Sequence, residues 1–283
     1  MISAASLFQP SLDARLLGAH RVPALTDEEL FCRTGVRIAF TGRAGGVSEG
    51  PYASLNLGLH VSDDPARVLE NRRRLLEAAA PPETPLIVPS QVHGSTCVTL
   101  SSTDEAALAD ARSRSDAGCD AVVGAVAGVA VLLNFADCLP LIIVSPTGRF
   151  AVVHAGWRGA VAGIAGAAVR ELLAADAAGG GRAFDAGSLI AYIGPHIRSE
   201  CFECGCDVRE RFVERFGASV APDVHHVDLA RAVSCDLTAA GLPPERIVDA
   251  RRCTRCGSDE YFSYRAAGGI CGRHGAFAYR EER

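Results

Sequence analysis

The sequence contains no lysine and only one methionine. Because arginine supplies all of the permanently cationic side chains, mechanisms that use a lysine Schiff base or a lysine general base are excluded. The chain also lacks an apolar run of the roughly 18–20 residues that cross a bilayer. No basic segment followed by an apolar one opens it. We therefore expect a cytoplasmic protein without a membrane partner.

An excess of positive charge is absent as well. The formal net charge is −5 and the sequence pI is about 5.9, whereas a nucleic-acid-binding surface usually shows a basic patch. We therefore expect no nucleic-acid partner. Hydrophobic residues make up 48% of the chain and charged residues 22%, which is enough apolar material for a packed core. The eleven cysteines are expected to be reduced, as core residues, metal ligands or nucleophiles.

Strand-like and helix-like segments alternate along most of the chain. Short β-branched and apolar stretches predict strands at 36–40, 86–94, 129–133, 139–144, 149–155, 188–195 and 246–250, and "YFSYR" and "GAFAYR" near the end are also strand-like. Apolar residues at helical spacing predict helices at 63–80, 159–175, 206–216 and 228–240.

The domain organisation follows from this alternation. Residues 1–35 look like a lead-in with at most one strand, and the glycine-rich stretch 177–187 predicts a loop. That loop is a poor domain boundary, because strong strand signals continue on both sides of it. The sequence predicts a single domain over residues 1–283 of the α/β (α+β) class, with a mixed β-sheet core and helices packed on it.

Two apolar strands around "VSPTGR" carry a geometric argument. The turn residues predict a β-hairpin with its loop at Ser145–Gly148. If Val144 faces Arg149 across this hairpin, Cys138 falls within one residue of His154 on the neighbouring strand. Side chains in such cross-strand positions lie about 4.5–8 Å apart. We therefore expect Cys138 and His154 to meet at one end of the hairpin.

A third candidate ligand, His93, follows a predicted strand in "SQVHG". One cysteine and two histidines form a sound zinc set with a fourth position open, the pattern of catalytic sites. Asp137 is next to Cys138 in the chain, and we expect its carboxylate to orient a ligating imidazole or a bound water. The residues alone leave two other interpretations open. Cys138 and His154 could be a nucleophile and its base, or the cysteine could be a small core residue.

Other residues suggest substrate or metal sites. Arg43, in the glycine-rich "GRAGGVSEG", and Arg158, after "HAGW", are candidate phosphate ligands because an arginine fork donates two hydrogen bonds at once. Trp157 is a candidate to stack on a base or to pack in the core. Two CxxC pairs, Cys201 with Cys204 and Cys253 with Cys256, leave open whether a second zinc is bound.

Several motifs occur in a fixed order: "TGRAGGVSEGPYASLNLGLHVSDDP", "ENRRRL", "SQVHG", "FADCLP", "VVHAGWRG", "YIGPHI" and "YFSYR…GR". This series resembles the YfiH family, also called the laccase-domain or polyphenol oxidase family, from about residue 36 to the C-terminus. The resemblance implies a metal bound by His93, Cys138 and His154. The sequence departs from the family pattern at "CFECGCDV" (201–208) and at Ala266, which concerns the substrate pocket more than the metal.

The resemblance implies a zinc-dependent purine nucleoside phosphorylase. Such an enzyme uses phosphate to release adenine or hypoxanthine from adenosine, inosine or methylthioadenosine, and it also deaminates adenosine. The catalytic residues would be His93, Cys138, His154 and Asp137. The partners would be a small purine nucleoside and phosphate; the physiological substrate and the oligomeric state are left open.

Three alternatives belong to other functional classes. The first is a cysteine hydrolase, including a peptidoglycan-precursor amidase, that uses Cys138 and His154. The second is a copper polyphenol oxidase, which the older family name suggests and which makes copper an alternative metal. Eight scattered histidines and one methionine do not supply the ligands of several copper centres. The third is a binding module without catalysis, which would not need a cysteine and a histidine to converge beside glycine-rich loops.

Overall fold

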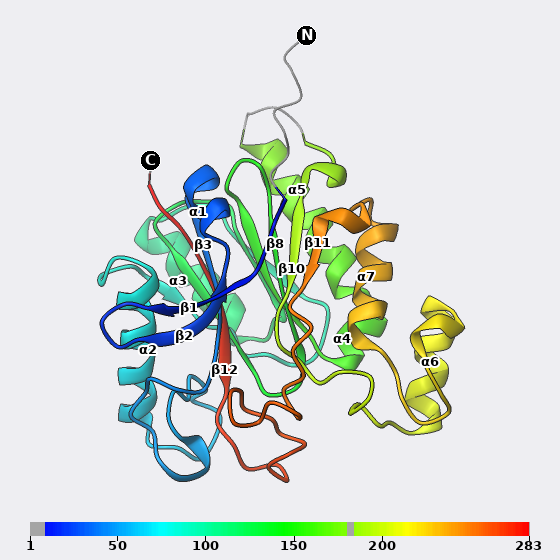
Figure 1. Cartoon of the computed structure of the whole chain (residues 1–283). Coiled ribbons are helices and arrows are strands. Elements are labelled where there is room, and N and C mark those ends of the chain that lie inside the picture. Colours follow the sequence, from blue (N-terminus) through cyan, green and yellow to red (C-terminus); the bar gives the residue numbers. More distant parts are fainter. Residues whose placement is uncertain (1–8, 180–183, 283) are drawn as a thin grey trace.

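The computed structural model describes residues 9–179 and 184–282 (Figure 1). The strands of this part of the chain are β1 Asp13–Leu17, β2 Val22–Thr26, β3 Val36–Thr41, β4 Leu86–Ile87, β5 Cys97–Leu100, β6 Ala121–Gly124, β7 Ala130–Phe135, β8 Leu139–Val144, β9 Phe150–Ala155, β10 Ile190–Ile193, β11 Ile247–Asp249 and β12 His274–Arg280. The α-helices are α1 Glu28–Thr34, α2 Pro65–Ala79, α3 Glu105–Asp116, α4 Trp157–Ala162, α5 Ile164–Ala178, α6 Cys206–Phe216 and α7 Leu229–Ala239.

These strands form two mixed sheets rather than the single sheet expected from the sequence. The first sheet has the order β1-β2-β3-β12-β7-β4 and the second β11-β10-β8-β9-β6-β5. In each sheet most neighbours are antiparallel. The exceptions are the parallel pairs β4–β7, β10–β11 and β5–β6. A single mixed α/β domain is therefore correct as a class, with two sheets in place of one.

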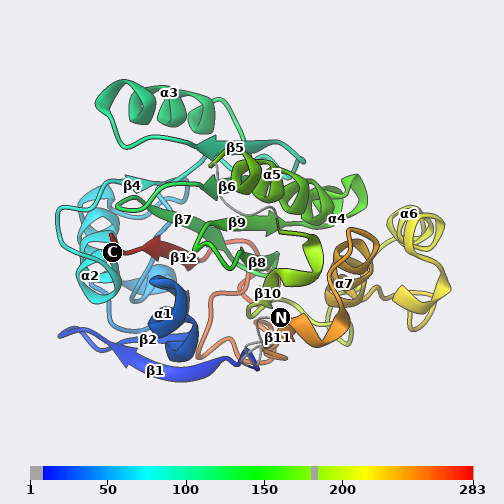
Figure 2. The same ribbon diagram turned by 90° about the horizontal axis from the view of Figure 1, so that it is seen from above.

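The two sheets pack face to face, as the view along the layers shows (Figure 2). Their shared core draws side chains from both sheets, among them Ile38, Val131 and Ala278 from the first and Ile142, Val152 and Tyr192 from the second. The middle strands are buried on both faces, which explains why they read as continuous apolar runs without alternation.

Helices cover the outer faces of this sandwich. Leu75 and Ala79 of α2 pack with Ala39, Leu132 and Phe277 on the outer face of the first sheet. Helices α4, α5 and α7 cover the second sheet with small and branched residues (Figure 2). Among the described residues, no helix combines the length and the apolar character needed to cross a bilayer.

Most of the predicted helices are present with small shifts of their ends. Helix α2 begins at Pro65, where the Asp64 carboxylate accepts the N–H of Ala66, a common N-terminal cap. The helix predicted at 159–175 is divided. Gly163, at φ 81, ends α4 and precedes α5, because this left-handed conformation interrupts a helix and favours glycine.

Several expectations were wrong. The strand predicted at 86–94 contains only Leu86–Ile87, since the chain then enters a loop. The segment "YFSYR" forms turns instead of a strand: Tyr261 and Phe262 are buried and Tyr264 is exposed, and the N–H of Tyr261 bonds locally to the carbonyl of Gly257. Residues 9–35 of the lead-in contain β1, β2 and α1, where at most one strand was expected. Strands β5 and β6 and helix α3 were not predicted. Residues 180–183 of the predicted glycine-rich loop lie outside the described residues.

Candidate active site

The hairpin β8–β9 brings the predicted cysteine and histidine together. The strands pair antiparallel, as predicted, with Leu139 opposite Ala155 and Val144 opposite Phe150. The register is one residue away from the expected pairing of Val144 with Arg149, because the turn between the strands includes Arg149. Cys138 lies directly before β8, and His154 lies near the end of β9 at the same edge of the sheet.

The loop that follows β4 places His93 against this pair. Its position is fixed by Gln91, whose side-chain amide donates to the carbonyl of Asn134 and accepts the N–H of Asn134, both at 2.8 Å. The side chain of Gln91 therefore satisfies both backbone groups of Asn134 in β7, as the backbone of a neighbouring strand would. His93 has φ 61, and its ring centre lies 4.8 Å from that of His154 in an edge-to-face arrangement.

The three side chains form a compact donor set. The thiol of Cys138 and one ring nitrogen each of His93 and His154 all lie within 4.8 Å of one another. The Nδ1 atom of His154 is 2.8 Å from the buried Asp120 carboxylate, so its N–H is held there and Nε2 is left as a free donor atom. A mixed sulfur and nitrogen set with one side open fits a zinc ion.

Without a metal, the same geometry favours an ion pair between thiolate and imidazolium. Burial by itself would raise the pKa of the Cys138 thiol, but the two neighbouring imidazoles lower it to about 6. Burial would lower the pKa of His154, whereas Cys138 and Asp120 raise it to about 9. The thiolate is the form of cysteine that ligates metals and attacks electrophiles.

Asp120 organises the site and was missed in the sequence. Its carboxylate is buried and accepts four hydrogen bonds. One oxygen takes the Nδ1–H of His154 and the N–H of His93 (2.9 Å), and the other takes the N–H groups of Gly94 (2.7 Å) and Val92 (3.3 Å). Although burial would raise the pKa of Asp120, these donors hold it below its usual value. One carboxylate thus positions both imidazoles.

Asp137 has different contacts from those expected for it. It has φ 94, and its carboxylate accepts the hydroxyl of Thr254 and the N–H of Arg265, both at 2.7 Å. These bonds fasten the C-terminal turns to the residue next to Cys138. Asp137 also lines the pocket described below, but the carboxylate that contacts an imidazole is that of Asp120.

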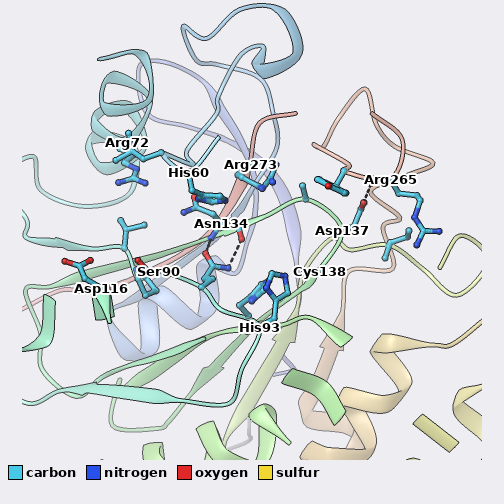
Figure 3. A pocket seen from close by; sticks show the side chains of 18 of the residues that line it. His60, Arg72, Ser90, His93, Asp116, Asn134, Asp137, Cys138, Arg265 and Arg273 are labelled. Atoms are coloured by element: carbon cyan, nitrogen blue, oxygen red, sulfur yellow. Dashed lines mark hydrogen bonds between the residues drawn. The ribbon is translucent and has the colours of Figure 1, made fainter. Parts of the chain in front are cut away.

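The three donors lie in a pocket of about 740 Å³. Figure 3 shows His93 and Cys138 on one side of it, and Arg72, His60 and Arg273 on the other. Burial lowers the pKa of Arg72 to about 10, so its side chain remains charged at neutral pH. Among the described residues, neither Arg72 nor Arg273 pairs with a carboxylate within 4.0 Å. The pocket therefore has a cationic wall opposite the thiol and the imidazoles.

The other residues predicted to bind substrate lie elsewhere. The guanidinium of Arg43 donates to the carbonyls of Ala53 (2.9 Å) and Ser258 (2.6 Å), where it joins two loops. Arg158 lies over the ring of Trp157, 4.3 Å from its centre. None of Arg43, Arg158 and Trp157 is among the residues that line the pocket. The arginines that do line it are Arg72 of "ENRRRL" and Arg265 and Arg273 of "YFSYR…GR", motifs quoted above without a role.

A glycine next to the donor set has a steric function. Gly156 has the ordinary backbone angles φ −69 and ψ 168, but a Cβ atom here would lie 2.7 Å from Cδ2 of His93 and 3.4 Å from Sγ of Cys138. We expect Gly156→Ala to displace the His93 ring and to lower metal affinity and turnover roughly tenfold. Metal titration and turnover of the folded variant measure the effect.

The matched control is Gly187→Ala. A Cβ atom at Gly187 meets only Asp185, at an ordinary contact distance of 3.4 Å, so this change should leave metal affinity and turnover at the wild-type level. Wild-type metal affinity in Gly156→Ala would show that the loop of His93 moves freely and would contradict the steric role.

The two mixed sheets and the pocket lined by one thiol, two imidazoles and arginines define an α/β protein with a Cys–His–His centre. The chain belongs to the YfiH or laccase-domain family: the family model described as multi-copper polyphenol oxidoreductase laccase matches residues 37–281. The resemblance noted in the sequence is thereby confirmed.

Relatives and solved structures agree with this assignment. The chain is 35% identical to a protein named purine nucleoside phosphorylase YlmD from Geobacillus stearothermophilus, over 88% of this chain and 91% of that protein. It is 33% identical to one named adenosine deaminase RL5 from an unknown prokaryotic organism, over 87% and 95% of the two chains. The crystal structure of YlmD superposes with a TM-score of 0.80 at 31% identity, covering 95% of this chain and 100% of that one.

Proposed function

We propose that this protein is an enzyme that cleaves purine nucleosides with phosphate and that also deaminates adenosine. The observation that carries the proposal is the position of the Cys–His–His set opposite the arginine wall in one pocket. A nucleoside and a phosphate fit such a pocket together, with the anion against the guanidinium groups and the nucleoside between the two walls. The names of the relatives support the same substrate class.

In this proposal the side chains of the chain bind and orient the reactants. Arg72 and Arg273 hold phosphate, since a planar guanidinium group can donate two parallel hydrogen bonds to phosphate oxygens. Burial and the two arginines lower the pKa of His60, so its imidazole is neutral at pH 7 and accepts or donates one hydrogen bond beside the anion. Asn134 lines the pocket with a buried side-chain oxygen that lacks a partner among the described residues, and it is the candidate for contact with the nucleoside.

We propose zinc as the metal held by His93, Cys138 and His154. A bound zinc ion would supply Lewis acidity and lower the pKa of a nearby water, which is the chemistry that deamination needs. Among the described residues, the ligand-type clusters contain two histidines at most. Several copper centres with histidine ligands would need more histidines, so we favour zinc at this site over a multi-copper oxidase.

A second candidate function is favoured by the hydrogen bond between Asp120 and His154. Cys138 lies beside His154, and His154 bonds to Asp120, which is how the nucleophile, the base and the orienting carboxylate are arranged in cysteine hydrolases. In such an enzyme the lowered pKa of Cys138 would provide the nucleophile at neutral pH. His93 would then lie outside the catalytic group, which makes the two functions separable by mutation.

Phosphate-dependent release of the base tests the proposed function directly. We expect the purified protein to convert inosine to hypoxanthine only when phosphate is present, and adenosine to inosine without it. In Arg273→Met the KM for phosphate should rise roughly 10–100-fold, because hydrogen bonds to charged groups contribute about 1.5–3 kcal/mol. Deamination of adenosine should change less, since it uses no phosphate. Chromatography of the bases and nucleosides measures both reactions.

Arg158→Met serves as the control for this test, because Arg158 is an exposed arginine that stacks on Trp157 and does not line the pocket. Its KM for phosphate should equal that of the wild type. Phosphate-independent release of hypoxanthine would contradict phosphorolysis. If Arg158→Met raised the KM for phosphate more than Arg273→Met did, the anion site would lie at Arg158, as the sequence suggested.

A further inference from the structure

A second group of thiols lies outside the active-site pocket. The Sγ atoms of Cys201, Cys253 and Cys256 and a carboxylate oxygen of Glu200 all lie within 4.8 Å of one another. The Sγ atoms of Cys201 and Cys256 are 3.4 Å apart, and all three cysteines are free. Thiolates around one tetrahedral zinc ion, each about 2.3 Å from it, lie about 3.8 Å from one another. The observed spacing is close to that and far from a disulfide bond of about 2.05 Å.

We propose that Glu200, Cys201, Cys253 and Cys256 bind a second divalent metal ion of the thiolate-preferring class, zinc, in a structural role. The four ligands complete a tetrahedral set without an open position, as structural zinc sites require. Three soft sulfur donors select zinc over magnesium or calcium, which prefer sets made of oxygen. On binding, each thiol that becomes a ligand releases its proton to solvent.

The turn from Cys253 to Cys256 presents its two thiols on the same side. The N–H of Gly257 donates to the carbonyl of Cys253 at 2.9 Å, which closes the turn. The Sγ atom of Cys253 accepts the N–H of Arg198 at 3.5 Å. A hydrogen bond from a backbone N–H group stabilises a thiolate, the form of cysteine that binds a metal.

The ligands come from one CxxC pair and from only half of the other. Cys204 does not belong to the cluster; its N–H donates to the carbonyl of His225 at 2.8 Å, in a separate contact. Glu200 takes the place that the sequence pattern assigned to Cys204. For this reason the spacing of the four cysteines alone could not define the site.

The metal would connect two segments that shape the active-site pocket. They leave the paired strands β10 and β11 side by side (Figure 1) and are already joined by the bridge between His196 and Cys253. Thr254, between the two cysteines of the turn, donates to Asp137, and Phe202, next to Cys201, lines the pocket. A metal at the cluster would therefore fix one wall of the pocket without contacting substrate.

Metal counting in reduced protein tests this site independently of any purine reaction. Metal-free wild type and variants, prepared with a thiol-free reductant, are titrated with zinc against a chromophoric chelator. We expect about two ions per chain in wild type and about one in each of Cys138→Ser and Cys256→Ser. Cobalt bound to Cys138→Ser should show intense thiolate-to-metal absorption, because three of its ligands are cysteines. Cys204→Ser is the control and should bind about two ions.

Three outcomes would overturn the proposal. One is a Cys138→Ser protein that binds no zinc under reducing conditions. Another is a wild type with one ion that Cys256→Ser does not remove. The third is a mass lowered by about 2 Da under these conditions, which would show a disulfide between Cys201 and Cys256. Cys256 is exposed, so its substitution should fold, and the experiment on Cys138→Ser leaves all four proposed ligands intact.

Discussion

Changing His93 to alanine should abolish zinc binding at the active site and adenosine deamination together. His93 supplies one of three donor atoms within 4.8 Å, and a set of one thiol and one imidazole does not hold zinc tightly. Cys138→Ser should have the same effect, because a serine hydroxyl stays protonated near neutral pH whereas a coordinating thiol is deprotonated. Bound zinc and adenosine turnover, measured on the same folded samples, check both results.

The same pair of variants separates the zinc enzyme from the cysteine hydrolase. With Cys138 as nucleophile and His154 as base, His93 would be dispensable, and His93→Ala would keep much of the activity while Cys138→Ser lost it. His226→Ala is the control, since the imidazole of His226 contacts the Asp223 carboxylate and lies outside both metal-type clusters. A His93→Ala protein that lacks the active-site zinc but keeps full turnover would refute the zinc proposal and favour the hydrolase.

The hairpin shows what the sequence can predict about this site. Its turn residues and two apolar strands are local signals, and they were sufficient to place Cys138 and His154 at one edge of a sheet. The register was wrong by one residue, because the composition of a four-residue turn does not determine how many residues the loop includes. The error did not separate the two side chains, since both lie at the end of the hairpin where neighbouring positions converge.

Contacts between residues far apart in the chain were harder to predict from the sequence. Asp120 lies directly before β6, and it comes close to His154 because β6 pairs with β5 and β9. Since β5 and β6 were not predicted, the sequence did not indicate this contact. An aspartate before a short apolar strand resembles any turn residue. The arginine wall combines Arg72 of α2 with Arg273 just before β12, positions that no local pattern connects. By contrast, Arg43 follows a strand in a glycine-rich loop, which resembles an anion site, yet it does not line the pocket.

Asp120→Asn should lower zinc affinity and turnover roughly 10–100-fold while leaving the fold intact, the range typical for carboxylates that orient metal-ligating histidines. Each carboxylate oxygen of Asp120 accepts two hydrogen bonds from N–H donors. An asparagine must place its NH₂ group against one of these pairs of donors. If the NH₂ group faces Gly94, the loop of His93 loses an acceptor and shifts.

If the NH₂ group faces His154 instead, the imidazole must accept at Nδ1 and carry its proton on Nε2. That nitrogen then points a proton, and no lone pair, toward Cys138 and the metal position. The two orientations therefore damage different ligands, and both weaken the site. Nitrogen NMR of the His154 ring distinguishes them, because it reports which nitrogen is protonated.

Asp176→Asn is the matched control for Asp120→Asn. Asp176 is an equally buried carboxylate, and it bonds to Ser145, Thr147 and Arg149 at the opposite end of the β8–β9 hairpin. Its substitution should lower the free energy of unfolding without changing zinc affinity per folded molecule. If Asp120→Asn and Asp176→Asn reduced stability alike and both kept full zinc affinity, Asp120 would be a structural residue with no part in orienting the ligands.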